Sequence, residues 1–284
     1  TVHTRIRSTI KTKKEFEEVG RKVRVHLPIP KVYEQVSNVE VHASNPEITY
    51  VAPFDAPQRT VYFETELKEN QEFMVDYSFD YHVDYVKLDP AKVSEEQPDF
   101  CLEEQAPHIV FTPYLRELRD ELAGDETNPV ILARRFYDFV TTKVMYSFMR
   151  EYFTIECIPE YCAINLKGDC GVQALLFITL CRMSGIPARW QSGLYVTKYY
   201  TGCHDWAQFY IAPYGWVFAD PSFGGSAWRE GDKERWNYYF GNLDIFRMPA
   251  NSEIQKEFMP EKKWLRIDPI DNQRGEFEYE DHGL

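Results

Sequence analysis

The sequence predicts an α+β fold in which an N-terminal β-sandwich precedes a helix packed on an antiparallel sheet. Apolar and polar residues alternate from Phe73 to Val83, which is typical of a half-buried antiparallel strand. Residues 172–183 are apolar at nearly every position, which indicates a buried helix. Two further segments, 204–212 and 216–220, flank a glycine-bearing turn and predict a β-hairpin.

The first part of the chain is rich in strand signals. Residues 21–28 alternate, residues 60–67 are β-branched and aromatic, and proline-bearing turn clusters separate these runs at a spacing typical of a sandwich. Residues 87–111 are polar, acidic and proline-bearing, as linkers commonly are. We therefore expect a β-sandwich domain over residues 1–100 and a second domain over residues 101–284 that ends in an extension.

The second domain begins with two helix starts, because Thr112 and Asn128 are capping residues that each precede a proline. The second of these helices is expected to run to about Val144. Residues 146–166 follow as an aromatic-rich irregular segment. A strand is expected near the end of the buried helix, over 189–197. Near the C-terminus, residues 276–280 alternate and are a candidate edge strand.

The buried helix carries the first candidate functional residue, Cys170. Asp169 is a candidate N-cap, and Gly185 with the following Ile-Pro ends the helix, so Cys170 falls in its first turn. A free cysteine is most often a small buried hydrophobe. Here flanking glycines permit close approach of a substrate, and the helix terminus is expected to lower the pKa of the thiol against the opposing charge of Asp169. We interpret Cys170 as a candidate nucleophile.

His204 and Asp220 are the candidate base and its orienting carboxylate. A nucleophilic cysteine needs a group that takes its proton, and that group needs a third one that holds the ring in one tautomer. The two residues lie an even number of positions apart in the predicted hairpin. A three-residue turn lets both face the cysteine helix, whereas a two-residue loop would place them on opposite faces. Alone, either residue is explained as well by a structural role.

Four segments of the chain together resemble the catalytic core of the transglutaminase-like superfamily, with its bacterial-type cysteine proteases. They are NLKGDCGVQA at 165–174, SGIPAR at 184–189, HDWAQFY at 204–210 and GWVFADP at 215–221. The resemblance covers about residues 125–225. It implies a papain-like core in which the cysteine helix packs on a sheet that carries the histidine and the aspartate.

The same resemblance implies a role for each matching residue. Cys170 matches the family nucleophile, His204 the general base and later acid, and Asp220 the residue that orients the imidazole. Trp206 matches the aromatic residue that follows the family histidine and is expected to pack. Tyr146 is the best match to the side chain that joins the Cys170 backbone N–H in stabilising the oxyanion.

These roles predict thiol-dependent acyl transfer on a peptide or protein substrate. Cys170 would attack an amide carbonyl, and water would resolve the acyl-enzyme, as in a peptidase or amidase. An amine in place of water would give a protein-glutamine crosslinking acyltransferase, but the sequence lacks calcium-loop spacing and the additional β-domains of those enzymes. A third alternative is a non-catalytic module that binds a protein or a glycan on the same fold.

Composition bounds the partners. A formal net charge of -13 argues against nucleic acid and against an anionic membrane surface, because both need a basic face. No apolar run approaches the ~20 residues of a membrane-spanning helix. Cysteine usage does not suggest a disulfide framework and favours a cytoplasmic location, or an extracytoplasmic one if an upstream signal has been removed. No oligomeric state is predicted.

No cofactor or metal is expected. Zinc knuckles consist of paired C-x2-C motifs, and the candidate cysteines lack them. These cysteines are Cys157, Cys162, Cys181 and Cys203. Histidines 26, 42 and 82 have no metal-like spacing and receive no role.

Overall fold

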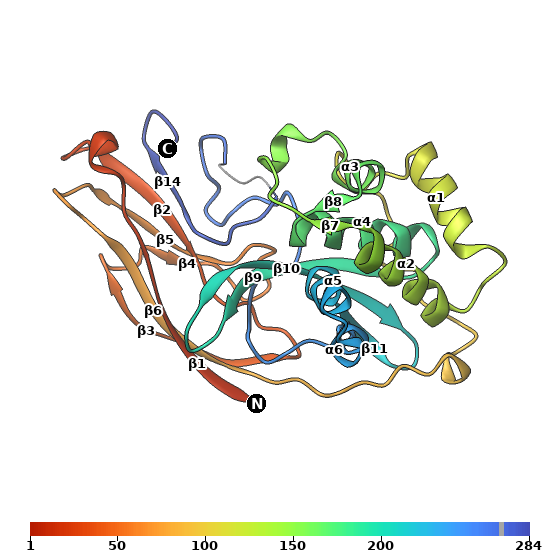
Figure 1. The fold of residues 1–284 in the computed structure, drawn as a ribbon. Helices are drawn as coiled ribbons and strands as arrows, with labels where there is room; N and C mark the ends of the chain where they lie inside the picture. Colours follow the sequence, from red (N-terminus) through yellow and green to blue (C-terminus); the bar gives the residue numbers. More distant parts are fainter. Residues whose placement is uncertain (267–269) are drawn as a thin grey trace. The chain divides into compact units, whose positions relative to one another are not determined.

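The computed structural model describes residues 1–266 and 270–284, which form two compact units (Figure 1). Unit 1 comprises Thr1–Val83, Ser192–Cys203 and Ile245–Leu284, and unit 2 comprises Asp84–Gln191 and His204–Asp244. These two units do not coincide with the predicted ranges 1–100 and 101–284. The C-terminal segment belongs to the same unit as the N-terminal residues, because it supplies a strand to a sheet of that unit. The predicted domain boundary itself stays a prediction.

Unit 1 contains two antiparallel sheets. The first has the order β1-β6-β3, with β1 at Val2–Ile10, β6 at Phe73–Tyr81 and β3 at Val36–Asn45. The second has the order β14-β2-β5-β4, with β14 at Glu276–Tyr279, β2 at Lys22–Pro28, β5 at Thr60–Glu66 and β4 at Tyr50–Val51. In Figure 1 the blue C-terminal strand β14 lies beside the red β2.

The two sheets of unit 1 share one apolar core. Phe73 of β6 meets Phe63 of β5 and Phe277 of β14 edge-on, with ring centroids 5.7 Å apart in both pairs. Because β6 belongs to one sheet and the other two strands to the second, the sheets enclose these rings between them, as in a β-sandwich. The strands predicted at 21–28, 60–67 and 73–83 are confirmed, and so is the edge strand predicted at 276–280.

The first helices of unit 2 begin where the capping residues predict. Thr112 accepts a hydrogen bond from the Leu115 N–H at 3.2 Å at the start of α1 (Pro113–Ala123). Asn128 likewise accepts from the Val130 N–H at 3.1 Å at the start of α2 (Pro129–Lys143). Both predicted helix starts are confirmed, because each cap satisfies N–H groups that the first turn leaves without intrahelical partners.

The predicted buried helix is α4 (Cys170–Met183), and it is confirmed. Asp169 caps it by accepting from the Val172 N–H at 3.2 Å, and Gly185 follows its end with a φ of +72°. From Cys170 to Arg182 every residue of the helix is buried. Phe177 on α4 packs edge-on against Phe209 of the sheet at 5.5 Å, so the helix lies on the sheet as expected.

The sheet of unit 2 has the order β12-β11-β10-β9. These strands are β9 (Ala188–Val196), β10 (Thr201–Ile211), β11 (Gly215–Ala219) and β12 (Phe240–Gly241). β9 and β10 each continue into unit 1, where β13 (Arg247–Asn251) pairs with residues 192–195 of β9. Ile211 pairs with Gly215 across a loop of residues 212–214, which confirms the predicted hairpin.

Several short elements of unit 2 differ from the prediction. The segment 146–166, expected to be irregular, contains the helix α3 (Ile158–Asn165) and a 3-10 turn, η3 (Tyr152–Thr154). Beyond the hairpin lie α5 (Pro221–Glu230) and α6 (Lys233–Tyr238), which the sequence analysis did not predict. Within the described part of the chain, no helix combines the length and apolarity needed to cross a membrane.

Candidate active site

Cys170 is the first residue of α4, and two very short strands hold the chain in front of it. β8 (Lys167–Gly168) pairs in parallel with β7 (Met145–Tyr146), which sets Tyr146 opposite Gly168, two residues before the thiol. A Cβ on Gly168 would lie 2.3 Å from a methyl group of Val172. Glycine is therefore required at 168, because only it lets this strand approach the first turn of α4 so closely.

The thiol of Cys170 donates a hydrogen bond to Oδ2 of Asp205 at 3.2 Å. Burial raises the pKa of the Tyr146 hydroxyl, and the neighbouring Cys170 thiol and Asp169 carboxylate raise it further. Burial raises the pKa of Cys170 well above its ordinary value, and the nearby carboxylates of Asp205 and Asp169 raise it further. The expected lowering of this pKa by the helix terminus is therefore wrong, because desolvation and two acidic neighbours outweigh the terminus.

Asp205 reaches the thiol because of strand alternation. It lies an even number of residues from Phe209 on β10, and Phe209 faces α4 through its contact with Phe177. Asp205 therefore projects to the side of the strand on which α4 lies. Its neighbour His204 leads in a different direction, towards Asp220 and Phe223.

His204 and Asp220 form a buried pair. Nε2 of His204 donates to Oδ2 of Asp220 at 2.7 Å, and the Asp220 side chain has no exposed surface. The β10–β11 register explains the contact: Ala207 pairs with Ala219, so Asp220 is the diagonal neighbour of His204 on the same face. The His204 ring also packs on Phe223 at 4.4 Å.

Asp220 has a second role in the fold. Its other oxygen, Oδ1, accepts from the Phe223 N–H at 3.0 Å and from the Ser222 hydroxyl at 3.1 Å, so Asp220 is the N-cap of α5. One carboxylate thus starts a helix with one oxygen and holds the imidazole with the other. Because Nε2 is the donor to Asp220, the basic lone pair of a neutral His204 ring is on Nδ1.

Trp206 is fully buried, as expected of a packing residue. Its Nε1 donates to the side-chain oxygen of Gln191 at 2.5 Å, and its ring lies 6.0 Å from that of His204. These contacts fix the strand around His204 and give the indole no exposed surface.

Sequence reasoning missed two residues of this region, Asp205 and Tyr152. The Tyr152 hydroxyl donates to the Asp169 carboxylate, and burial together with Asp169 raises the pKa of Tyr152 well above its ordinary value. A Cβ on Gly171 would lie 2.4 Å from that hydroxyl and 2.8 Å from the Asp205 carboxylate. The available signal for Asp205 was its alternation with Phe209 on the predicted strand.

The other cysteines and histidines lie elsewhere. All six cysteines are free thiols. Nδ1 of His26 bonds Thr60, Nε2 of His42 bonds Ser78, and Nδ1 of His82 bonds Thr1. Among residues 1–266 and 270–284, no group of three or more acidic, histidine or cysteine side chains is placed to hold a metal ion.

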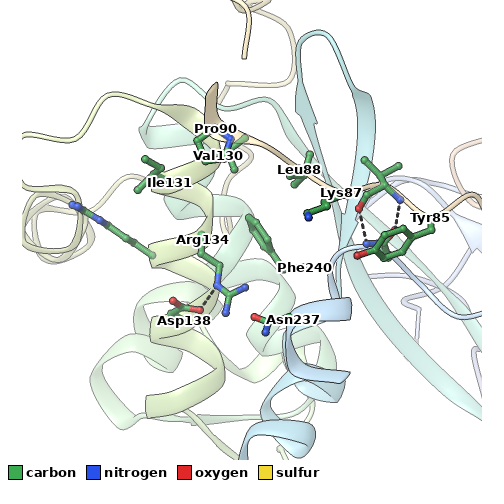
Figure 2. Close-up of a pocket in the computed structure, with 13 residues that line it drawn as sticks. Tyr85, Lys87, Leu88, Pro90, Val130, Ile131, Arg134, Asp138, Asn237 and Phe240 are labelled. Carbon is green, nitrogen blue, oxygen red and sulfur yellow. Dashed lines mark hydrogen bonds and ion pairs between the residues drawn. The ribbon is translucent and has the colours of Figure 1, made fainter. Parts of the chain in front are cut away.

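A separate cavity of about 490 Å³ lies within unit 2, between α2, α6 and the segment 85–90 (Figure 2). Arg134 donates to Asp138 at 2.6 Å, and its guanidinium carbon lies 4.3 Å from the centre of the Trp236 ring. Burial raises the pKa of Asp138. None of the residues that line this cavity belongs to the candidate active site, so its polar groups are structural neighbours of α2 and not part of the cysteine's surroundings.

Comparisons with known proteins concern the fold. Among solved structures, "a Putative Cysteine Protease from Cytophaga hutchinsonii" is similar at 14% identity with a TM-score of 0.58, over 97% of this chain and 84% of that one. The periplasmic domain of TgpA from Pseudomonas aeruginosa is similar at 14% identity with a TM-score of 0.44, over 78% and 76%. No curated protein matches the chain.

A family model described as the transglutaminase-like superfamily matches residues 116–221. The matched range runs from α1 through Cys170 and the hairpin to Asp220, so it contains the helix, the sheet strands and the polar residues described above. Residues 116–221 of this chain therefore match the core of the transglutaminase-like superfamily.

Proposed function

We propose that the protein is a thiol-dependent acyl-transfer enzyme that hydrolyses peptide or amide bonds in a peptide or protein substrate. The observation that carries the proposal is the buried 2.7 Å hydrogen bond between His204 and Asp220, which lies one residue along β10 from the side chain that contacts the Cys170 thiol. A buried imidazole held by a carboxylate is the group that cysteine nucleophiles use as a base.

In the first half of the proposed reaction, Sγ of Cys170 forms a bond to the carbonyl carbon. The thiol proton passes to Nδ1 of His204 once substrate binding brings the thiol to the ring, which Asp220 and Phe223 hold. Asp220 holds the ring in this tautomer and stabilises the imidazolium that results. The backbone N–H of Cys170 and the Tyr146 hydroxyl stabilise the oxyanion, because the pairing of β7 with β8 places Tyr146 opposite Gly168, two residues before the thiol. The amine leaves with the proton from His204.

In the second half, water attacks the thioester and gives up a proton to His204. The carbon–sulfur bond then breaks, and the proton returns to the Cys170 sulfur. Because burial and acidic neighbours favour the neutral thiol, proton removal accompanies attack and does not precede it. In this order His204 acts as a general base while the bond between sulfur and carbon forms. It is not merely the counter-ion of a thiolate that exists before attack.

The experiment that tests this function is hydrolysis of a mixed peptide-amide library by the wild type, Cys170→Ala and Cys203→Ser. Cys203 is a partly exposed free thiol of unit 1 and serves as the matched control. We expect wild type and C203S to release amine and C170A to release none. Hydrolysis by C170A at the wild-type rate would contradict the proposal.

The same assay separates hydrolysis from crosslinking. An added primary amine competes with water for the acyl-enzyme, and the amide it forms is detected by mass spectrometry. We expect free carboxylate as the main product at millimolar amine. Exclusive formation of the new amide would instead assign the chain to transamidation.

A further inference from the structure

The hydrogen bond that occupies the Cys170 thiol runs to Asp205, whereas the proposed base is His204. The two residues are neighbours on β10, and strand alternation sends them in different directions. A thiol that donates to a carboxylate keeps its proton on sulfur, because the carboxylate accepts the bond and its negative charge opposes a second negative charge beside it. The arrangement therefore favours an unreactive thiol.

We propose that Asp205 is a latch that holds the Cys170 thiol protonated in the free protein and releases it when substrate binding breaks the Sγ–Oδ2 hydrogen bond. The latch rests on the proposed function. It adds one step before attack, in which the Sγ–Oδ2 hydrogen bond breaks. Release of the thiol proton to Nδ1 of His204 then accompanies formation of the bond to the carbonyl carbon.

The surroundings of the thiol support a built arrangement and not a chance contact. The titratable side chains near it include Asp205 from β10, Asp169 from the cap of α4, Tyr146 from β7 and Tyr152 from η3. Asp205 is buried, with 6% of its surface exposed. The lack of a side chain at Gly171 makes room for the Asp205 carboxylate and the Tyr152 hydroxyl, because a Cβ there would overlap both.

Two of these groups already have a partner that fixes their role. Asp169 caps α4 and accepts from Tyr152, so its carboxylate is committed to the helix end and to the phenol. Asp205 is the carboxylate that contacts sulfur directly. The chain therefore offers a matched pair of acidic residues, both near Cys170, of which one carries the latch contact.

The test is the rate of Cys170 alkylation by iodoacetamide between pH 5 and 10, followed by mass spectrometry of the Cys170 peptide. In this reaction the thiolate forms a bond to carbon and iodide leaves, so the rate reports the thiolate fraction. Asp205→Asn keeps the shape and an acceptor oxygen but removes the charge. We expect D205N to alkylate about tenfold faster than wild type at pH 7.5, with its midpoint shifted to lower pH by about one unit.

Asp169→Asn is the matched control, because asparagine still caps a helix. It also removes a charge near Cys170, and we expect a smaller acceleration than in D205N. Asp205→Glu keeps the charge and is expected to alkylate slowly, like wild type. An unchanged or slower rate in D205N would overturn the latch, and a slower rate would identify Asp205 as the base that removes the thiol proton.

If D205N does not fold, the wild-type profile alone decides. The latch requires a Cys170 midpoint above the value of about 8.5 of an ordinary thiol, and a midpoint below it overturns the proposal. Alkylation needs no substrate, so the outcome is separable from the hydrolysis assay. If the wild type hydrolyses amides but Cys170 of D205N is alkylated at the wild-type rate, the latch alone is disproved. If the wild type hydrolyses no amide but Cys170 of D205N is alkylated faster, only the proposed function is disproved.

Discussion

Asp220 divides its two carboxylate oxygens between a helix and an imidazole. Oδ1 caps α5, and Oδ2 holds His204. The strength of the α5 cap and the orientation of the His204 ring therefore depend on the same side chain. Two substitutions of Asp220 can separate these two effects. An amide retains an acceptor for the cap but has only one acceptor oxygen, whereas alanine retains neither.

We predict that Asp220→Asn lowers kcat by about 10⁴ with little change in the free energy of unfolding, because the amide caps α5 but no longer enforces the His204 tautomer. Asp220→Ala is expected to lose the same activity and, in addition, about 1 kcal/mol of stability from the cap. Steady-state kinetics and chemical unfolding measure the two effects.

The control for this pair is Asp232, which caps α6 by accepting from the Arg235 N–H at 3.0 Å. Asp232→Ala is expected to cost a comparable amount of stability and to leave kcat unchanged. Loss of activity in D232A, or full activity in D220N, would show that Asp220 acts only as a helix cap.

At the scale of elements, β2 contains a buried histidine whose protonation opposes folding. His26 is almost fully buried beside Phe258 and Tyr62, and burial, with Lys262 and Arg266 nearby, lowers its pKa to about 3. The unfolded chain takes up this proton near pH 6.5, and the folded chain takes it up near pH 3. Stability conferred by a neutral His26 is therefore present above pH 6.5 and lost as pH falls towards 3.

We predict that the free energy of unfolding falls by about 1.4 kcal/mol for each pH unit through most of this window. His26→Asn removes that contribution to the slope, although it also lowers stability at neutral pH through lost ring packing. His42→Asn, on β3, is the control and keeps the wild-type slope. Urea unfolding at several pH values measures these slopes, and equal slopes in wild type and H26N would refute the assignment.

The elements also show what sequence can predict. A capping residue before proline located α1 and α2, and the same signal stands at Asp220-Pro221, at the end of the predicted strand 216–220. The sequence of α5, PSFGGSAWRE, also contains two glycines, which are poor helix formers. α3 begins after Cys157, which makes no side-chain cap, so its start is marked only by Pro159 and Glu160 in the first turn.

The contacts of the candidate site also differ in whether the sequence can predict them. The His204–Asp220 contact lies within one hairpin, and spacing in a hairpin is readable from the chain. The Cys170–Asp205 contact joins a helix to a strand and depends on how α4 packs, which local patterns do not encode. For that reason the sequence revealed the buried helix, its terminus beside the thiol and the opposing charge of Asp169, but not the second carboxylate, that of Asp205.

At the scale of the whole molecule, unit 1 combines three separate stretches of chain. Its second sheet is completed by β14, whose Phe277 packs on Phe73 and is 4% exposed. We predict that Phe277→Ala lowers the free energy of unfolding of unit 1 by about 3 to 5 kcal/mol, because it leaves a cavity in the shared core. Chemical unfolding with hydrogen exchange at β2 measures the loss.

Val51→Ala is the matched control for this prediction. Val51 lies on β4, at the opposite edge of the same sheet, and is 41% exposed. Its truncation is expected to cost less than about 1 kcal/mol. Similar losses in F277A and V51A would mean that β14 contributes little to the core.

The pairing of β14 with β2 also sets an order of events during synthesis. All of unit 2 has been translated by residue 244, whereas the partner of β2 arrives only with residues 276–279. One hydrogen-bonding edge of β2 therefore stays unpaired while some two hundred and fifty later residues leave the ribosome. Strand β2 is made before all of unit 2 but is paired on both edges only after it, and nascent chains are exposed to β-type misassociation along its open edge.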